Sequence, residues 1–351
     1  MIEKLKDYKN IISERIIDRF SEFEKKLKNI NRWGEDVVNK LKNFMLSGKF
    51  IRGGLVLFTE EMYNQKFSSA AVDVALSCEL FQAGLLIHDD IMDKDTLRRQ
   101  NKTIFYQYKE IFDGLTDDSY HFGESMGICA GDISYFLGFD NLSKIDIDKN
   151  ILLKIIELFS KEMIYVGLGQ MEDVYYSTTD KELNEDRIIS IYLYKTSRYT
   201  FSLPFMAGAI LAGESNEEVR KLEALGENFG IVFQIKDDEL GMFGSSEKIG
   251  KPIGSDIKEK KKTFYYYYLK ELADQKDMKT MMEIYSKDNV EIDDVETIRN
   301  LIKKYKIQEK INEKLLLFSN FITEGIKSLN IKDEYKKGLF EFLDYNLSRS
   351  F

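Results

Sequence analysis

The chain contains only two prolines in 351 residues, Pro204 and Pro252. Proline is a strong helix breaker because its ring removes a backbone donor and clashes with the preceding turn. Apolar residues also recur at intervals of three and four, as in Leu5, Tyr8 and Ile12. Together the two features predict a chain built from long helices.

Six segments share this apolar spacing and are predicted to be helical: 69–92, 125–143, 150–175, 185–214, 216–242 and 297–328. The aromatic run at 264–269 is predicted to begin a further helix. Breaks are expected at 47–48, 112–119 and 243–256, and a connection or exposed helix pair near 274–295. Sustained period-two alternation is absent from the sequence. The simplest account is one all-α domain over residues 1–351.

Composition excludes several classes of protein. The formal net charge of −9 argues against nucleic-acid binding, which requires a basic face. The two cysteines, Cys78 and Cys129, lie in apolar helical stretches and are expected to be reduced core thiols, which fits a cytoplasmic location. The charged N-terminal segment is not a signal peptide, and no uncharged apolar run reaches the roughly 18 residues of a transmembrane helix.

Acidic residues interrupt the apolar pattern at IHDDIMD, residues 87–93. Asp89 and Asp93 are four residues apart, so they lie on one face of a helix, one turn from each other. Like charges at a helix C-terminus favour a bound cation, and Mg²⁺ prefers one or two carboxylates together with phosphate oxygens. A solvated acidic helix end is the alternative. The arginines at 98 and 99 favour a metal-bound diphosphate.

A second acidic segment, FQIKDDELG, occupies residues 233–241. It is predicted to end a helix at its paired aspartates, with Gln234 and Asp237 sharing a face. A basic, glycine-containing stretch follows, in which Lys251 lies in a constrained loop between Gly250 and Pro252. Two such acidic helix ends could hold metals that grip a diphosphate from both sides.

Five motifs occur in the same order as in the polyprenyl synthetase family, and the chain resembles its short-chain farnesyl and geranylgeranyl members. Each motif is weak alone, but the ordered set spans roughly residues 40 to 265. The motifs are GKFIR (48–52), DDIMD (89–93) with its arginine pair, GQMED (169–173), KTSRY (195–199) and FQIKDD (233–238) with the loop after it.

The resemblance implies the isoprenoid synthase fold, a helical bundle around a central cavity. It also implies Mg²⁺-dependent condensation of isopentenyl diphosphate with an allylic diphosphate, three metal ions and a homodimer. The metal ligands would be Asp89, Asp93 and Asp237. The allylic diphosphate would contact Arg98, Lys195 and Lys251. Isopentenyl diphosphate would contact Lys49, Arg52, Gln82 and Arg99. The side chains of Thr196, Tyr199 and Gln234 would face the reacting carbons.

The sequence departs from the family pattern at Gly241 and Gln100, and Gln82 occupies a site that is often histidine, although other members also carry glutamine there. Gly241 stands where many members carry a third aspartate of the second acidic motif, and Gln100 replaces the glycine that usually follows the arginine pair. The first departure is expected to matter little, since the third metal rests on Asp237. The second is expected to change the loop that carries Arg98 and Arg99.

The resemblance also places an apolar tunnel for the growing product below Asp89. Gly84 and Leu85 precede that residue by one helical turn, and Phe81 by two. An aromatic side chain at position 84 would close the tunnel early. Gly84 therefore predicts geranylgeranyl diphosphate as the product, with farnesyl or longer-chain products as alternatives.

Other functions compete with this interpretation. A terpene cyclase shares the fold but lacks the G-K-x-x-R and arginine-pair elements, and a non-catalytic partner subunit often loses the acidic motifs. A di-iron bundle would need E-x-x-H pairs, which are absent from the sequence. His88 and His121 are expected to be structural.

Overall fold

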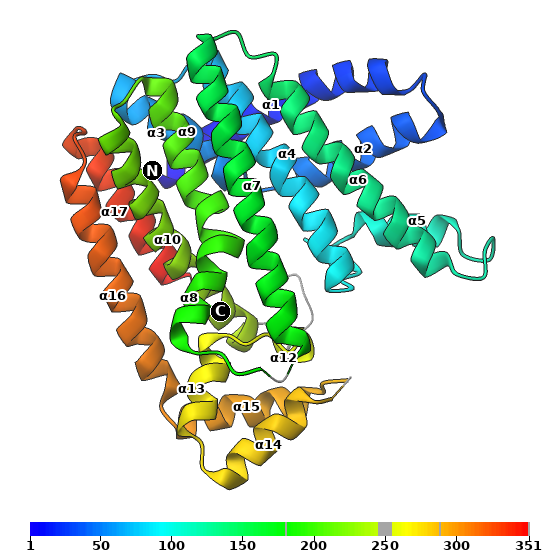
Figure 1. The fold of residues 1–351 in the computed structure, drawn as a ribbon, viewed down its shortest axis with the longest axis vertical. Helices are drawn as coiled ribbons and strands as arrows, with labels where there is room; N and C mark the ends of the chain where they lie inside the picture. The colour runs from blue at the N-terminus through cyan, green and yellow to red at the C-terminus, as the bar shows by residue number, and fades with distance from the viewer. Residues whose placement is uncertain (180, 245–254, 288, 350–351) are drawn as a thin grey trace. The chain divides into compact units, whose positions relative to one another are not determined.

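The computed structural model describes residues 1–179, 181–244, 255–287 and 289–349. Almost all of its regular structure is helical (Figure 1). The first elements are α1 (Ile2–Leu27), α2 (Arg32–Leu46), α3 (Ile51–Asn64), α4 (Ser69–Met92), β1 (Leu97–Arg98), β2 (Asn101–Lys102), α5 (Ile104–Ile111), α6 (Ser119–Leu142) and α7 (Lys149–Thr178). The remaining elements are α8 (Glu185–Ile191), the π-helix η1 (Tyr192–Ser202), α9 (Leu203–Ala212), α10 (Asn216–Phe243), α12 (Ser255–Lys258), α13 (Phe264–Leu272), α14 (Gln275–Tyr285), α15 (Ile292–Lys304), α16 (Ile307–Ser328) and α17 (Asp333–Ser348).

The predicted all-α class is confirmed, and several helices begin where the sequence supplies a cap. Ser68 accepts a hydrogen bond from the Ala71 amide at the start of α4, and Asp118 accepts one from the His121 amide at the start of α6. Such side-chain acceptors satisfy amides that have no partner within the helix. The cap at Asp118 explains why α6 begins before residue 125, the predicted start.

Two other details of the helix prediction were also wrong. The stretch 297–328 is broken between α15 and α16, where Lys306 adopts a left-handed φ of 53°. The second acidic segment does not end its helix, because α10 continues past the paired aspartates to Phe243. The aromatic run at 264–269 does begin a helix, α13, as predicted.

The chain divides into two compact units, residues 1–158 with 207–215 and residues 159–206 with 216–351. In the first unit, α4 is the central element and packs against α6, α3 and α1. It is buried along most of its length, and 78% of its most apolar window lies inside the fold. By length and composition alone α4 could cross a membrane, but a buried core helix passes the same test.

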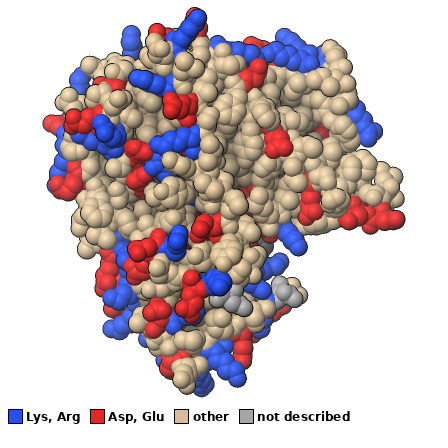
Figure 2. All heavy atoms as spheres, in the orientation of Figure 1, with Lys and Arg blue, Asp and Glu red and all other residues tan. Residues whose placement is uncertain are grey.

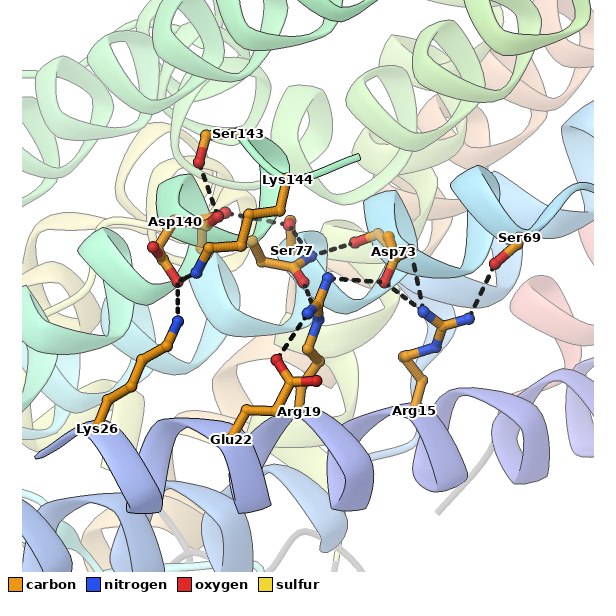
Figure 3. A network of polar contacts seen from close by, with 12 residues as sticks. Arg15, Arg19, Glu22, Lys26, Ser69, Asp73, Ser77, Asp140, Ser143 and Lys144 are labelled. Atoms are coloured by element: carbon orange, nitrogen blue, oxygen red, sulfur yellow. Dashed lines mark hydrogen bonds and ion pairs between the residues drawn. The ribbon is translucent and has the colours of Figure 1, made fainter. Parts of the chain in front are cut away.

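Polar side chains tie α1, α4 and α6 together within the first unit (Figure 3). Arg15 donates to both carboxylate oxygens of Asp73, at 2.8 and 3.0 Å. Arg19 donates to the Asn141 side chain, whose amide in turn donates to the Asp73 carbonyl and to Ser77. Burial raises the pKa of Asp73, although both arginines oppose this effect. These contacts fix the register between the helices that position the first acidic segment.

In the second unit, α10 packs against η1, α16 and α17. An aromatic cluster lies between these helices, with the ring centroids of Phe229 and Phe342 5.6 Å apart and those of Phe201 and Phe229 6.1 Å apart. Ser197 of η1 meets Gly230 of α10 so closely that a Cβ at Gly230 would lie 2.2 Å from the Ser197 Cα. The absence of a side chain at Gly230 therefore lets the two helices approach.

The prediction of two core thiols is correct for Cys78, which is buried, and wrong for Cys129, which is exposed. Cys129 lies on α6 next to Ile128, which is 48% exposed. An apolar stretch of α6 is thus partly on the surface. On the face drawn in Figure 2, acidic and basic side chains are interspersed, and the residues drawn there form no continuous basic surface of the kind that nucleic acids require.

Candidate active site

The first acidic segment lies at the C-terminal end of α4. The helix ends at Met92, and the amide of Asp93 donates to the Asp89 carbonyl at 2.8 Å. The two aspartates are therefore one turn apart, as predicted, and both are half-buried. Their carboxylates offer only oxygen ligands, which fits a hard cation such as Mg²⁺.

Asp90 is the buried member of this segment, with a side chain only 1% exposed. Arg98 Nε donates to Asp90 Oδ1 at 2.5 Å, and Arg98 Nη2 donates to Asp89 Oδ2 at 3.3 Å. Burial raises the pKa of Asp90 to about 7, although Arg98 opposes it. Burial alone would lower the pKa of Arg98, but Asp90 and Asp89 outweigh that effect and raise it. The sequence assigned no role to Asp90. In the structure it is the buried carboxylate that holds Arg98.

A short hairpin returns the chain from α4 to this cluster. Strands β1 and β2 pair antiparallel, with Arg98 opposite Asn101. Arg99 and Gln100 form the turn with left-handed φ values of 52° and 63°. Such turns favour glycine, because a Cβ crowds the backbone at positive φ. The family pattern has a glycine at the second of these positions, and the hairpin forms here with glutamine in its place.

The hairpin carries Arg99 to the end of α2, immediately before the GKFIR motif. Arg99 Nη1 donates to the Phe44 carbonyl at 3.5 Å and to Ser47 Oγ at 3.3 Å. Lys49 is exposed at the start of the motif, and Arg52 is half-buried in the first turn of α3. The structure thus brings together Arg99 and the segment that leads into Lys49, although they are far apart in sequence.

Glu79 lies buried on α4 behind these cations. Its Oε1 accepts a hydrogen bond from the Gly53 amide at 2.8 Å, in the first turn of α3. Burial raises its pKa, and the Gly53 hydrogen bond and the charges of Arg52 and Arg99 oppose that effect. Gln82 lies one turn further along α4 and is half-buried. Glu79 was not predicted as part of the site.

Gly84 forms a contact between α4 and α6. A Cβ at this position would lie 2.5 Å from Tyr135 Cε1 and 2.9 Å from the Gly131 carbonyl oxygen. The ring of Phe81, one turn earlier, lies 6.1 Å from that of Tyr135 and 4.8 Å from that of Phe139. Leu85 is half-buried. The space beside Gly84 is therefore taken by the Tyr135 ring, so this ring would stand between Gly84 and a tunnel.

In the second unit, the GQMED and KTSRY motifs meet. Lys195 donates to Asp173 Oδ2, and a Cβ at Gly169 would lie 2.5 Å from the Lys195 amide nitrogen. The motif KTSRY lies within η1, a π-helix, and such helices often mark functional sites. Thr196 and Tyr199 are half-buried on it. The backbones of α7 and η1 approach so closely here that position 169 has no room for a side chain, which explains the glycine of the GQMED motif.

Arg198 of the same motif is buried among three glutamates. It donates to Glu162, Glu223 and Glu227, and Glu162 is fully buried. Burial alone would lower the pKa of Arg198, but Glu162 and Glu223 outweigh it and raise the pKa. This ion cluster holds α7, η1 and α10 together and is a structural element next to Tyr199.

The second acidic segment occupies the last turns of α10. Gln234 Nε2 donates to Asp238 Oδ1 at 2.8 Å, and the Tyr192 hydroxyl of η1 donates to Asp238 Oδ2. Asp238 is buried, whereas the Asp237 side chain is 53% exposed and accepts a hydrogen bond from Arg349 at 3.0 Å. Asp237 is therefore the accessible carboxylate of the pair. Lys251 lies outside the described residues.

The two histidines occupy different environments. His88 packs against α6, where its Nε2 lies 3.1 Å from the Ile128 carbonyl oxygen and its ring lies 5.5 Å from that of Tyr135. His121 is largely exposed at the start of α6.

Comparison with known proteins supports a single family. The sequence pattern of the polyprenyl synthetase family matches residues 35–302. A short chain isoprenyl diphosphate synthase of Methanocaldococcus jannaschii is 30% identical over 77% of this chain and 77% of its own. A geranylgeranyl diphosphate synthase of Sulfolobus acidocaldarius is 26% identical over 82% of this chain and 81% of its own.

A solved structure agrees with these relatives. The geranylgeranyl pyrophosphate synthase of Corynebacterium glutamicum, complexed with isoprenyl diphosphate and magnesium, superposes with a TM-score of 0.92. It is 26% identical, and the match covers 99% of both chains. The chain therefore belongs to the polyprenyl synthetase family and is an enzyme that transfers prenyl groups.

Proposed function

We propose that the enzyme condenses isopentenyl diphosphate with allylic diphosphates head-to-tail and gives an all-trans product, geranylgeranyl diphosphate. One observation carries the proposal. At the end of α4, Arg98 pairs with Asp89 and Asp90, while its neighbour Arg99 turns away toward the segment before Lys49. One arginine therefore contacts the first acidic segment, and its neighbour contacts the segment before the GKFIR motif. Two separate cationic positions fit a reaction that uses two diphosphates.

Magnesium is the metal that the carboxylates fit best. We assign Asp89 and Asp93 to two ions and Asp237 to a third. These residues offer oxygen ligands, and the first two lie a helical turn apart. When bound, the ions would neutralise the negative charge that develops on the departing allylic diphosphate.

Lysine and arginine side chains would also help to neutralise the negative charge on the departing allylic diphosphate. Arg98, Lys195 and Lys251 are assigned to the allylic diphosphate, because a guanidinium or ammonium favours the leaving group as its charge grows. Lys195 is held by Asp173, which would fix the position of its ammonium group. Lys49, Arg52, Gln82 and Arg99 are assigned to isopentenyl diphosphate.

Neutral side chains would surround the reacting carbons. Thr196, Tyr199 and Gln234 are assigned to this role, because their oxygens stabilise a carbocation without trapping it covalently. Gln234 Nε2 is engaged by Asp238, so its Oε1 is the atom left for the cation. The allylic diphosphate departs and leaves an allylic cation, which the double bond of isopentenyl diphosphate attacks. The released diphosphate then takes the proton that the product loses.

Product length would be set on α4 by Phe81, Gly84 and Leu85, with farnesyl or longer products as the alternative. The names of the Sulfolobus and Corynebacterium relatives support the geranylgeranyl product.

We also propose a single catalytic domain over residues 1–351, a cytoplasmic location and a homodimer. Phe136 and Ile128, 72% and 48% exposed on α6, support the homodimer, because an exposed apolar helix face favours burial against a partner.

Product analysis tests the proposed function. The protein is incubated with Mg²⁺, isopentenyl diphosphate and allylic primers of increasing length, and the products are resolved by chain length. Geranylgeranyl diphosphate is the expected product. A metal-dependent cyclic product without condensation would indicate a terpene cyclase, and no turnover with any primer would indicate a non-catalytic partner subunit.

A further inference from the structure

In the second acidic segment, the carboxylate of Asp237 is paired with an arginine side chain from the end of α17. Arg349 directly follows α17, and its Nη2 donates to Asp237 Oδ1 at 3.0 Å. The same guanidinium lies 4.4 Å above the ring of Phe233. Phe233 and Asp237 are one turn apart on α10, so the Arg349 side chain contacts two residues on the same face of that helix.

The fold, rather than a chance surface contact, places Arg349 there. Helix α17 packs against α10 (Figure 1), and Phe342 anchors it in the aromatic cluster with Phe229 and Phe201. The Arg349 side chain is only 17% exposed, whereas that of Asp237 is 53% exposed. The arginine is therefore held in place, and the carboxylate remains open to a ligand from solvent.

The arrangement leaves Arg349 incompletely satisfied. Its Nη1 is buried and has no hydrogen-bond partner among the described residues. A buried donor without an acceptor costs free energy, so holding the Arg349 guanidinium in this position is less favourable than it would be if every donor were used. The ion pair can therefore neutralise Asp237 and still give way to a divalent cation.

We propose that Arg349 is a positioning residue that competes with Mg²⁺ for Asp237. It holds the carboxylate while the second acidic segment carries no metal, and it sets the Mg²⁺ concentration at which that segment fills. This inference rests on the proposed function, in which Asp237 is a metal ligand. Because a cation already neutralises Asp237, removal of that cation makes the carboxylate a stronger metal ligand.

The test compares Arg349→Gln with Arg349→Lys and a matched control. Inorganic pyrophosphate is titrated into the full-length protein by calorimetry at a series of Mg²⁺ concentrations, and the Mg²⁺ concentration giving half-maximal pyrophosphate binding is determined. Lys337→Gln is the control, because it removes one positive charge from an exposed position on the same helix. Asp237→Asn tests the underlying assignment of the metal ligand.

The Gln variant is expected to lower the half-saturating Mg²⁺ concentration about two- to fivefold, the range that a partly exposed ion pair supports. The Lys variant keeps the charge and should stay closer to the wild type, and the Lys337 control should not change. An unchanged or raised value for Arg349→Gln overturns the inference, and a raised value would indicate that Arg349 serves the diphosphate. If Asp237→Asn leaves the Mg²⁺ dependence unchanged, the assignment of Asp237 as a ligand fails instead.

Discussion

Replacement of Arg98 by alanine should destabilise the protein far more than loss of an ordinary surface charge. Arg98 is the hydrogen-bonded partner of Asp90, at 2.5 Å, and the Asp90 side chain is 1% exposed. The change would leave a carboxylate buried beside a second one, Asp89. Breaking a buried ion pair in this way costs about 3–5 kcal/mol. An exposed ion pair is worth only about 0.2–1 kcal/mol.

The free energy of unfolding can be measured by urea titration followed by far-ultraviolet circular dichroism, because the described chain is almost entirely helical. Lys102→Ala is the matched control in the same hairpin, since Lys102 pairs with Glu110 and the two side chains are 51% and 37% exposed. A double variant, Asp90→Leu with Arg98→Met, should recover most of the lost stability, because an apolar pair of similar size often replaces a buried ion pair without cost. Equal losses of unfolding free energy for Arg98→Ala and Lys102→Ala would show that the Arg98–Asp90 pair contributes no more than an exposed ion pair.

Two further predictions concern α4. Gly84→Phe should shorten the main product by at least one isoprene unit, because the new ring would displace the Tyr135 ring toward the tunnel. A Cβ at position 84 would also lie 2.9 Å from the Gly131 carbonyl oxygen, so circular dichroism of the variant checks that it folds. An unchanged product length, resolved by chromatography, would show that position 84 does not set it. Glu79→Gln should gain thermal stability relative to the wild type as the pH rises from about 5 to 8. Burial raises the pKa of Glu79, so the folded wild type binds more protons than the unfolded chain above the ordinary value of 4.5 and loses stability as the pH rises. A melting-temperature difference that stays constant with pH would contradict this.

Local patterns predicted the helices well because each signal acts within a few residues. The predicted helix at 69–92 coincides with α4, where Ser68 caps one end and the acidic segment follows the other. The turn at Arg99 and Gln100 was visible only as a departure from the family pattern, since no local rule marks glutamine for a left-handed conformation. Burial of Asp90 was not predictable, because Asp89 and Asp93 in the same segment carry the same side chain and are only half-buried.

Contacts between distant segments account for the remaining differences. Helix α6 is apolar along much of its length, so periodicity did not reveal that Cys129 faces outward. The Tyr135 ring beside Gly84 and the pairing of Arg349 with Asp237 both join residues far apart in the chain. Nothing in a short window of sequence specifies such pairs, because packing of whole helices creates them.

Measurement of Mg²⁺-dependent condensation by the wild type and by Asp93→Asn tests whether the first acidic segment binds the metal that the reaction needs. Labelled isopentenyl diphosphate is supplied with an allylic primer, and the rate of prenyl diphosphate formation is followed with and without a metal chelator. Asp113→Asn, in the exposed loop between α5 and α6, is the control. Chelation is expected to abolish the reaction, Asp93→Asn to slow it about a hundredfold or more, and the control variant to keep the wild-type rate. Condensation that proceeds equally well without metal, or in the Asp93 variant, would contradict metal binding by the first acidic segment.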